Sequence, residues 1–138
     1  MAVLAMTSCR VEINSVDMSA HVAAVELELE GVELDTTNFG SSGWETAIMG
    51  LKSSSLKVKF NDDFASTTVD DRIYALWLAG AAVAYKIRPT SGSISATNPS
   101  FEGSFLPNSF VAVAGNVGDL ATKDLTWPGT GAVTRVTS

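Results

Sequence analysis

Residues 87–103 read IRPTSGSISATNPSFEG and contain the clearest structural signal in the sequence. Pro89 closes an apolar run, and a loop rich in serine, threonine and glycine then leads through Pro99 to an alternating segment that begins at Phe101. Each proline fixes its own backbone and holds the preceding residue extended, so the connection stays out of a helix. The pattern therefore predicts two strands joined by an extended turn, with the second strand returning beside the first.

Alternation of apolar and polar residues predicts strands on both sides of this pair. From Val25 to Glu30 the odd positions are apolar and the even positions acidic, and after Gly31 the phase inverts. A one-residue slip at a glycine is typical of a β-bulge, so we predict one long strand that is bulged at Gly31. Further segments of strand character are residues 10–13, 54–60, 81–88, 101–110 and 120–127.

One helix is predicted, over residues 67–79. A threonine pair can cap its start, two aspartates in its first turn favour the positive end of the helix dipole, and Gly80 ends it. The apolar stripe expected to face the core is Val69, Ile73, Leu76 and Trp77. The predicted fold class is mainly β with one flanking helix, an antiparallel β-sandwich or partial barrel that forms a single domain over residues 1–138.

Three segments do not fit this core. Residues 36–50 centre on a Gly-Ser-Ser-Gly run, have no sustained period and predict a long inter-strand loop, of a length that usually has a function. Trp44 lies in this loop, where it has little to pack on within its own subunit, so it is a candidate for contact with a partner. Residues 1–8 and 128–138 are expected to be terminal arms.

Composition narrows the class of protein. A chain of 138 residues with 46% hydrophobic residues is long enough for one folded core. Charged residues amount to 17%, below the roughly 25% of typical soluble domains, which suggests that part of the surface meets partners. Fifteen acidic residues against nine basic ones, with no basic cluster beyond Lys57 and Lys59, argue against a clamp that grips phosphates.

The sequence predicts no catalytic, metal-binding or cofactor-binding residues, and hence no enzyme. His21 and Cys9 are each the only residue of their type, too few for a structural zinc site, and no nucleophile elbow or phosphate-binding glycine loop is present. The aspartate pairs 62–63 and 70–71 lack the spacing of a calcium loop and are expected in a solvated loop and a helix start. No apolar run reaches the ~20 residues of a membrane span, which predicts no membrane insertion.

Three short segments carry a resemblance to a known family: residues 16–19 (Val-Asp-Met-Ser), residues 88–99, and residues 118–120 (Gly-Asp-Leu). With them, the chain resembles the tail tube (major tail) proteins of long-tailed bacteriophages from about Arg10 to Ala132. The resemblance implies a virion protein, made in the cytoplasm of a bacterial host. It would form homohexameric rings that stack into a helical tube around a tape-measure protein, bounded by tail terminator and tip proteins. DNA would pass through this tube, a conduit into the host, without specific binding.

The resemblance also implies roles for particular residues. The loop 36–50 would reach the neighbouring ring, and both terminal arms would make contacts between subunits. The inter-subunit contact candidates are Phe39, Trp44, Ile48 and Met49. Two alternatives remain for the acidic face of the long strand, which consists of Glu26, Glu28 and Glu30. These residues line the lumen, or they pair across strands with Lys57 and Lys59 on an ordinary solvated face.

A different class of function also fits the composition. A monomeric β-sandwich module that binds carbohydrate or protein would present surface aromatics such as Trp44 and Trp127 on a preformed face. A tube protein should form rings or polymers as its concentration rises, whereas such a module should stay monomeric. The size of the particles in solution therefore separates the two classes.

Overall fold

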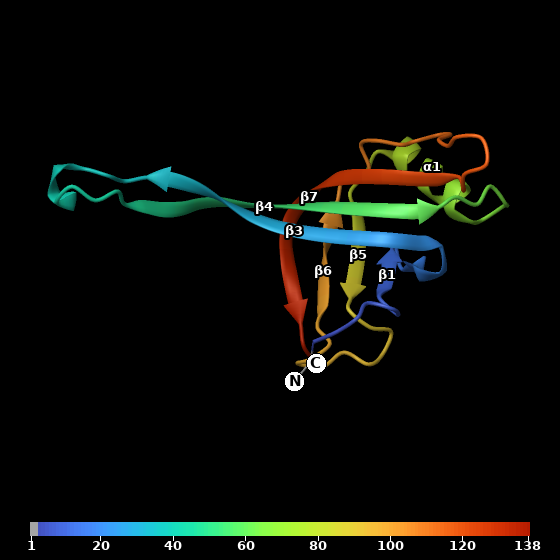
Figure 1. Ribbon diagram of the computed structural model, residues 1–138, viewed down its shortest axis with the longest axis horizontal. Coiled ribbons are helices and arrows are strands. Elements are labelled where there is room, and N and C mark those ends of the chain that lie inside the picture. The colour runs from blue at the N-terminus through green and yellow to red at the C-terminus, as the bar shows by residue number, and fades with distance from the viewer. Residues whose placement is uncertain (1–2) are drawn as a thin grey trace.

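The computed structural model describes residues 3–138 (Figure 1). In chain order, the elements are β1 (Arg10–Ile13), β2 (Val16–Asp17), the 3-10 helix η1 (Ser19–His21), β3 (Val22–Asp35), the 3-10 helix η2 (Phe39–Ser41), β4 (Ala47–Asn61), α1 (Val69–Ala79), β5 (Val83–Arg88), β6 (Ser100–Phe105) and β7 (Thr122–Val136). Of the predicted N-terminal arm, residues 1 and 2 lie outside the described residues. Residues 3–8 are exposed and form neither helix nor strand.

The strands form one antiparallel sheet in the order β2-β1-β5-β6-β7-β4-β3. The sheet does not close on itself, and β7 belongs to both of its halves, since its first part pairs with β4 and its second part with β6. Figure 1 shows the layer of β3, β4 and the first part of β7 crossing the strands β1, β5 and β6. The mainly β class with one helix, in a folded-over, partly barrel-like sheet, is therefore confirmed.

The course of β7 corrects the predicted C-terminal arm. Residues 129–136 continue the strand and pair with β6, with Ser100 opposite Val136. The strand turns from one layer to the other at a Pro-Gly-Thr-Gly segment. A side chain on Gly129 would collide with Ser54, and Gly131 has a φ of 78°, in the left-handed region. These residues show no alternation, and so the sequence pattern did not predict this half of the strand.

The core lies between the two layers. Leu56, Val58 and Phe60 from β4 face strands β1, β5 and β6, and all three are buried. Trp127 from β7 is fully buried and stacks on Phe105 with ring centroids 4.5 Å apart. Its indole is therefore not available as the surface aromatic that a carbohydrate-binding face would need.

Helix α1 ends as predicted, at Gly80 in the left-handed conformation, but it begins at Val69, two residues later than predicted. Thr68 precedes it without the predicted capping bond, because its hydroxyl donates to the carbonyls of Asp63 and Ala65 instead. Val69 and Ile73 are buried, and Leu76 packs against the core. Trp77, however, was predicted to face the core and is 42% exposed. Only the inner part of the stripe reaches the core, while Trp77 lies beside a ring from another segment of the chain.

The connection between β5 and β6 has the predicted form of two antiparallel strands joined by an extended turn, with Ile87 opposite Phe101. Asn98 fixes it. This side chain is buried, accepts a hydrogen bond from the Thr90 amide at 3.0 Å, and donates to the carbonyls of Gly92 and Ser93 at 3.1 Å each. A single asparagine thus satisfies the backbone of a loop that has no regular structure.

The turn at residues 16–19 is held by its polar side chains. The Asp17 carboxylate accepts a hydrogen bond from the Ser19 amide at 3.0 Å, and the Ser19 hydroxyl accepts one from the Val11 amide at 2.9 Å. Met18 between them is buried in the core. This motif therefore has a structural purpose, because it closes the β1–β2 hairpin and starts the chain toward β3.

Candidate assembly surfaces

Strands β3 and β4 extend beyond the body as a long hairpin (Figure 1). The ladder continues to the pair Asp35 and Ala47, so the connecting loop covers only residues 36–46. The predicted loop 36–50 was therefore too long by the four residues 47–50. Those residues (Ala-Ile-Met-Gly) do not alternate, and they become a strand because β3 supplies the hydrogen bonds.

The predicted bulge is confirmed by a register shift between Gly31 and Glu33. Beyond it, large side chains of each strand lie across glycines of the other. Met49 lies over Gly31, and Leu34 lies over Gly50, each so close that a Cβ on the glycine would press against it. The glycines thus let large side chains lie across a ribbon that has no core beneath it.

The end of the hairpin is ordered by its own hydrogen bonds. Asn38 and Ser41 form a capping box. The side-chain oxygen Oδ1 of Asn38 accepts a hydrogen bond from the Gly40 amide at 2.8 Å, and the Ser41 hydroxyl accepts one from the Asn38 amide at 3.1 Å. Phe39 is fully exposed at this end, and Trp44 is 77% exposed. We call these two residues the tip.

The four predicted contact residues therefore all lie on the hairpin and are exposed. Phe39 and Trp44 form the tip, whereas Ile48 and Met49 lie on β4 behind it. Each of the four side chains is more than half exposed, and their role in contacts between subunits stays a prediction.

A second exposed apolar surface lies on α1 and the loop before β7. Tyr74, Trp77 and Phe110 form an aromatic cluster, with ring centroids of Tyr74 and Phe110 5.6 Å apart and of Trp77 and Phe110 6.4 Å apart. The exposed Leu78 extends it. We call these four residues the aromatic patch. Sequence reasoning missed it, because Trp77 was assigned to the core and residues 106–110 to a strand that ends at Phe105.

Two buried side chains of β7 hold the loop that carries Phe110. The Lys123 ammonium donates to the carbonyls of Val111 and Ala112 at 2.7 and 2.9 Å and lies 4.8 Å from the centroid of the Phe110 ring. The Trp127 indole N–H donates to the carbonyl of Ser109 at 3.0 Å. The loop is irregular, but its carbonyls are fixed from below, and this fixes the position of the Phe110 ring.

The charge of Lys123 is balanced by two aspartates. Its ammonium lies 2.9 Å from the Asp62 carboxylate and 3.2 Å from that of Asp70, and the side chains of Lys123 and Asp62 are fully buried. The expectation that Asp62 lies in a solvated loop was therefore wrong. A buried lysine must be paired, and the lone cation in an apolar strand was the signal that a partner carboxylate would be found nearby.

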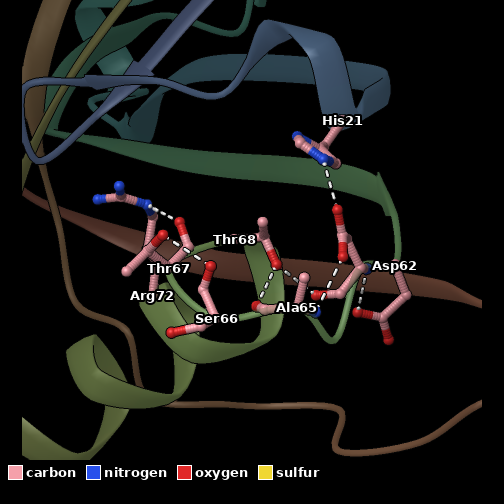
Figure 2. Close-up of polar contacts among 8 residues, drawn as sticks. His21, Asp62, Ala65, Ser66, Thr67, Thr68 and Arg72 are labelled. Atoms are coloured by element: carbon pink, nitrogen blue, oxygen red, sulfur yellow. Dashed lines mark hydrogen bonds and ion pairs between the residues drawn. The ribbon is translucent and has the colours of Figure 1, made fainter.

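His21 contacts the segment that leads into α1. Figure 2 shows it pointing from the end of η1, just before β3, toward the connection that precedes α1, where its Nε2 lies 3.1 Å from the Asp63 carboxylate. The pKa of Asp63 is lowered by the hydrogen bond from the Ala65 amide and then by the one with His21. Thr68 donates to the Asp63 carbonyl at 2.9 Å and ties the start of the helix to the same segment.

Within residues 3–138, no three His, Cys, Asp or Glu side chains are grouped so that they could hold a metal ion. No helix in the described part of the chain is both long enough and apolar enough to cross a membrane.

The acidic face lies on the outer side of β3. Glu26 is opposite Lys57, but Glu28 and Glu30 are opposite serines, and in residues 3–138 neither Lys57 nor Lys59 forms an ion pair with these glutamates. The hydrogen bond between Glu28 and Glu30, and then the charge of Glu30, raise the pKa of Glu28. Of the three glutamates, only Glu26 has a lysine directly opposite that could neutralise its charge. The rest of the face is acidic.

Comparison with protein-family models found none that matches this sequence, and comparison with curated protein sequences found no match either. Solved structures with the same fold do exist. A chain from the virion of a native gene transfer agent (GTA) particle matches with a TM-score of 0.78 and 18% sequence identity, over 98% of this chain and 100% of that chain. A chain from the tail of an empty GTA particle with C6 symmetry matches with a TM-score of 0.68 and 18% identity, over 85% of this chain and 83% of that chain. The protein therefore has a fold that is also found in the virion and tail of gene transfer agent particles, which agrees with the fold implied by the resemblance to phage tail tube proteins.

Proposed function

We propose that the protein is a structural subunit of a phage-like tail. It polymerises as stacked hexameric rings into the tail tube, the conduit through which DNA is delivered. The observation that carries the proposal is the β3–β4 hairpin, a long ribbon with exposed apolar side chains on a domain whose fold occurs in a tail of C6 symmetry.

The projecting hairpin would be unfavourable in a protein that stays monomeric. A two-stranded ribbon is marginally stable in water, and contiguous exposed apolar residues normally mark an interaction site. The exposed large side chains of the ribbon are Leu29, Val32, Leu34, Phe39, Trp44, Ile48, Met49 and Leu51. A neighbouring subunit would bury them, and a contact between different surfaces of successive copies builds a polymer.

The acidic face fits the wall of such a tube. Lysine or arginine side chains that neutralise phosphates strengthen DNA binding, so a wall that DNA must pass is better without them. Glu28 and Glu30 have no basic residue opposite, and their repulsion of the duplex acts over a Debye length of about 8 Å at physiological salt. We place the acidic face in the lumen, with no catalytic role and no cofactor.

Other components of the tail follow from the same proposal. A tape-measure protein would occupy the lumen during assembly, and terminator and tip proteins would close the two ends.

Replacing Glu26, Glu28 and Glu30 by lysine should leave tubes that assemble but release DNA slowly. Normal ejection from normal tubes would place the acidic face outside the lumen.

The hairpin is tested by shortening it within its own register. Residues 34–48 are replaced by Asn-Gly, which joins the opposed residues Glu33 and Met49 by a tight turn. We expect a folded subunit that stays monomeric at concentrations where the unaltered protein forms rings or tubes in sedimentation and electron micrographs. An unaltered protein that stays monomeric at all concentrations would favour a binding module and refute the proposal.

A further inference from the structure

The tip and the aromatic patch lie at opposite ends of the molecule. Figure 1, drawn with the longest axis horizontal, shows the hairpin reaching out on one side of the body, while α1 and the loop before β7 lie on the other. The tip of one chain therefore cannot reach its own patch. A second copy displaced along this axis brings the two surfaces together.

The residues that define the tip and the aromatic patch are all uncharged. Residues 36–44 contain no charged side chain, and neither do residues 73–85 or 106–118, which contain the patch. The whole chain is 17% charged, so these uncharged stretches meet the composition expected of a docking surface, where charges are depleted and aromatic residues enriched. Contact between them would bury apolar area without removing a charge from water.

The patch is also rigid. Tyr74 and Trp77 are fixed on a helix, and the Phe110 ring is held by the bonds of Lys123 and Trp127 to its loop. Rigid aromatic side chains at the centre of a contact contribute most of the binding energy in protein interfaces, and they tend to meet the same kind of residue on the partner. Phe39 and Trp44 are such residues, presented on a capped turn.

We propose that the tip of one subunit docks on the aromatic patch of a second copy of this chain, in the adjacent ring. This inference rests on the proposed function and specifies which surface receives the hairpin. Because the two surfaces differ and lie at opposite ends, the contact is head-to-tail and does not close on itself, as a stack of rings requires.

Disulfide trapping between two populations tests the contact. In a Cys9→Ser background, which has no other cysteine, one population carries Glu45→Cys beside the tip and the other carries Asn108→Cys beside Phe110. Both positions are exposed, and both substitutions leave the tip and the patch in place. We expect cross-linked dimers only in the mixture of the two populations, and only under conditions where tubes form.

The matched control replaces Asn108→Cys by Ser91→Cys, an exposed position in the β5–β6 connection, which should give no cross-link. Tubes that form but cross-link at Ser91 and not at Asn108 would overturn the docking site while leaving the tube function intact. Absence of any polymer would overturn both.

A second variant measures the energetics. Tyr74→Ser with Leu78→Ser removes exposed apolar groups of the patch and should raise the concentration needed for tube formation at least about tenfold, because patch residues act as anchors. The melting temperature of the subunit should change little. An unchanged assembly threshold would contradict the proposal.

Discussion

The two halves of the β3–β4 pair share one hydrogen-bonded ladder but differ in what lies beneath it. In the half next to the body, Leu56 is 1% exposed and faces a core. Beyond the bulge at Gly31, Leu34 is 47% exposed and Ile48 is 59% exposed. The two halves thus have the same backbone pairing, but the side chains of one half are buried and those of the other are exposed. The inner half is part of the fold, and the outer half is a structure whose apolar side chains await a partner.

The largest effect is expected where the inner half packs. Trp127→Ala removes a fully buried indole and its stacking on Phe105, and should lower the free energy of unfolding by about 3–5 kcal/mol. Trp44→Ala, the same change on the hairpin, should alter it by less than about 0.5 kcal/mol. Thermal unfolding of the monomeric subunit measures both. Equal losses would show that the hairpin belongs to the folding core after all.

Lys123→Ala should come next. It leaves the buried Asp62 carboxylate without its cation, and should cost about 3 kcal/mol in denaturant unfolding. It also frees the carbonyls of Val111 and Ala112, so the backbone of residues 109–114 should become more mobile, measured by NMR order parameters. Lys57→Ala, which removes an exposed lysine, is the control. Unchanged order parameters in Lys123→Ala would mean that the loop is held by other contacts.

Trp77→Ala separates stability from assembly. Because Trp77 is partly exposed and stacks on Phe110, its loss should cost about 1 kcal/mol of subunit stability rather than the larger penalty of a core residue. Tube formation should nevertheless be weakened, since the patch loses an aromatic ring. A loss of stability as large as that of Ile73→Ala would restore Trp77 to the core.

The smallest effect is a difference in pH dependence between the two regions. In the body, hydrogen bonds from the Ala65 amide and then with His21 lower the pKa of Asp63 from its ordinary 3.8. The ionised Asp63 therefore stabilises the folded state above pH 3.8, and this stabilisation is lost as the pH falls through the lowered pKa. On the ribbon, the pKa of Glu28 is raised above its ordinary 4.5 by its hydrogen bond with Glu30 and by the charge of Glu30. The two carboxylates repel each other when both are ionised, and this repulsion is relieved as the pH falls through the raised pKa.

Two neutral variants check these opposite signs. The melting temperature of the unaltered protein should fall as the pH drops below 3.8, and Asp63→Asn should make this fall smaller. The hairpin amides of the unaltered protein should become better protected as the pH is lowered, and Glu28→Gln should abolish this gain. Protection factors corrected for the intrinsic exchange rate are the measurement for the hairpin. A hairpin that loses protection on acidification in the unaltered protein would contradict the assigned repulsion.

What the sequence predicted were features that a few neighbouring residues determine. The β5–β6 pair follows from two prolines around a serine-rich turn, the bulge from a phase slip at Gly31, and the helix end from Gly80. Each depends on local backbone conformation or on a short period, and tertiary contacts do not change it.

The features that were missed depend on distant partners. The second half of β7 is a strand because β6 lies beside it, and residues 47–50 are a strand because β3 does. Trp77 stacks on Phe110, a residue far along the chain whose position the helical period cannot indicate. The exposed residues at the end of the hairpin were predicted to lie on a loop. They could still be singled out from the sequence, because Trp44 is a large apolar side chain in a segment that offers it no core to pack on.

A helical reconstruction of the polymer formed by the purified protein tests the central claim most directly. We expect the outer half of the hairpin, residues 31–51, to lie against a subunit of the adjacent ring, with Phe39 and Trp44 buried there. A polymer in which that ribbon projects into solvent, with both aromatic side chains uncovered, would contradict the claim that the outer half of the hairpin is an assembly surface.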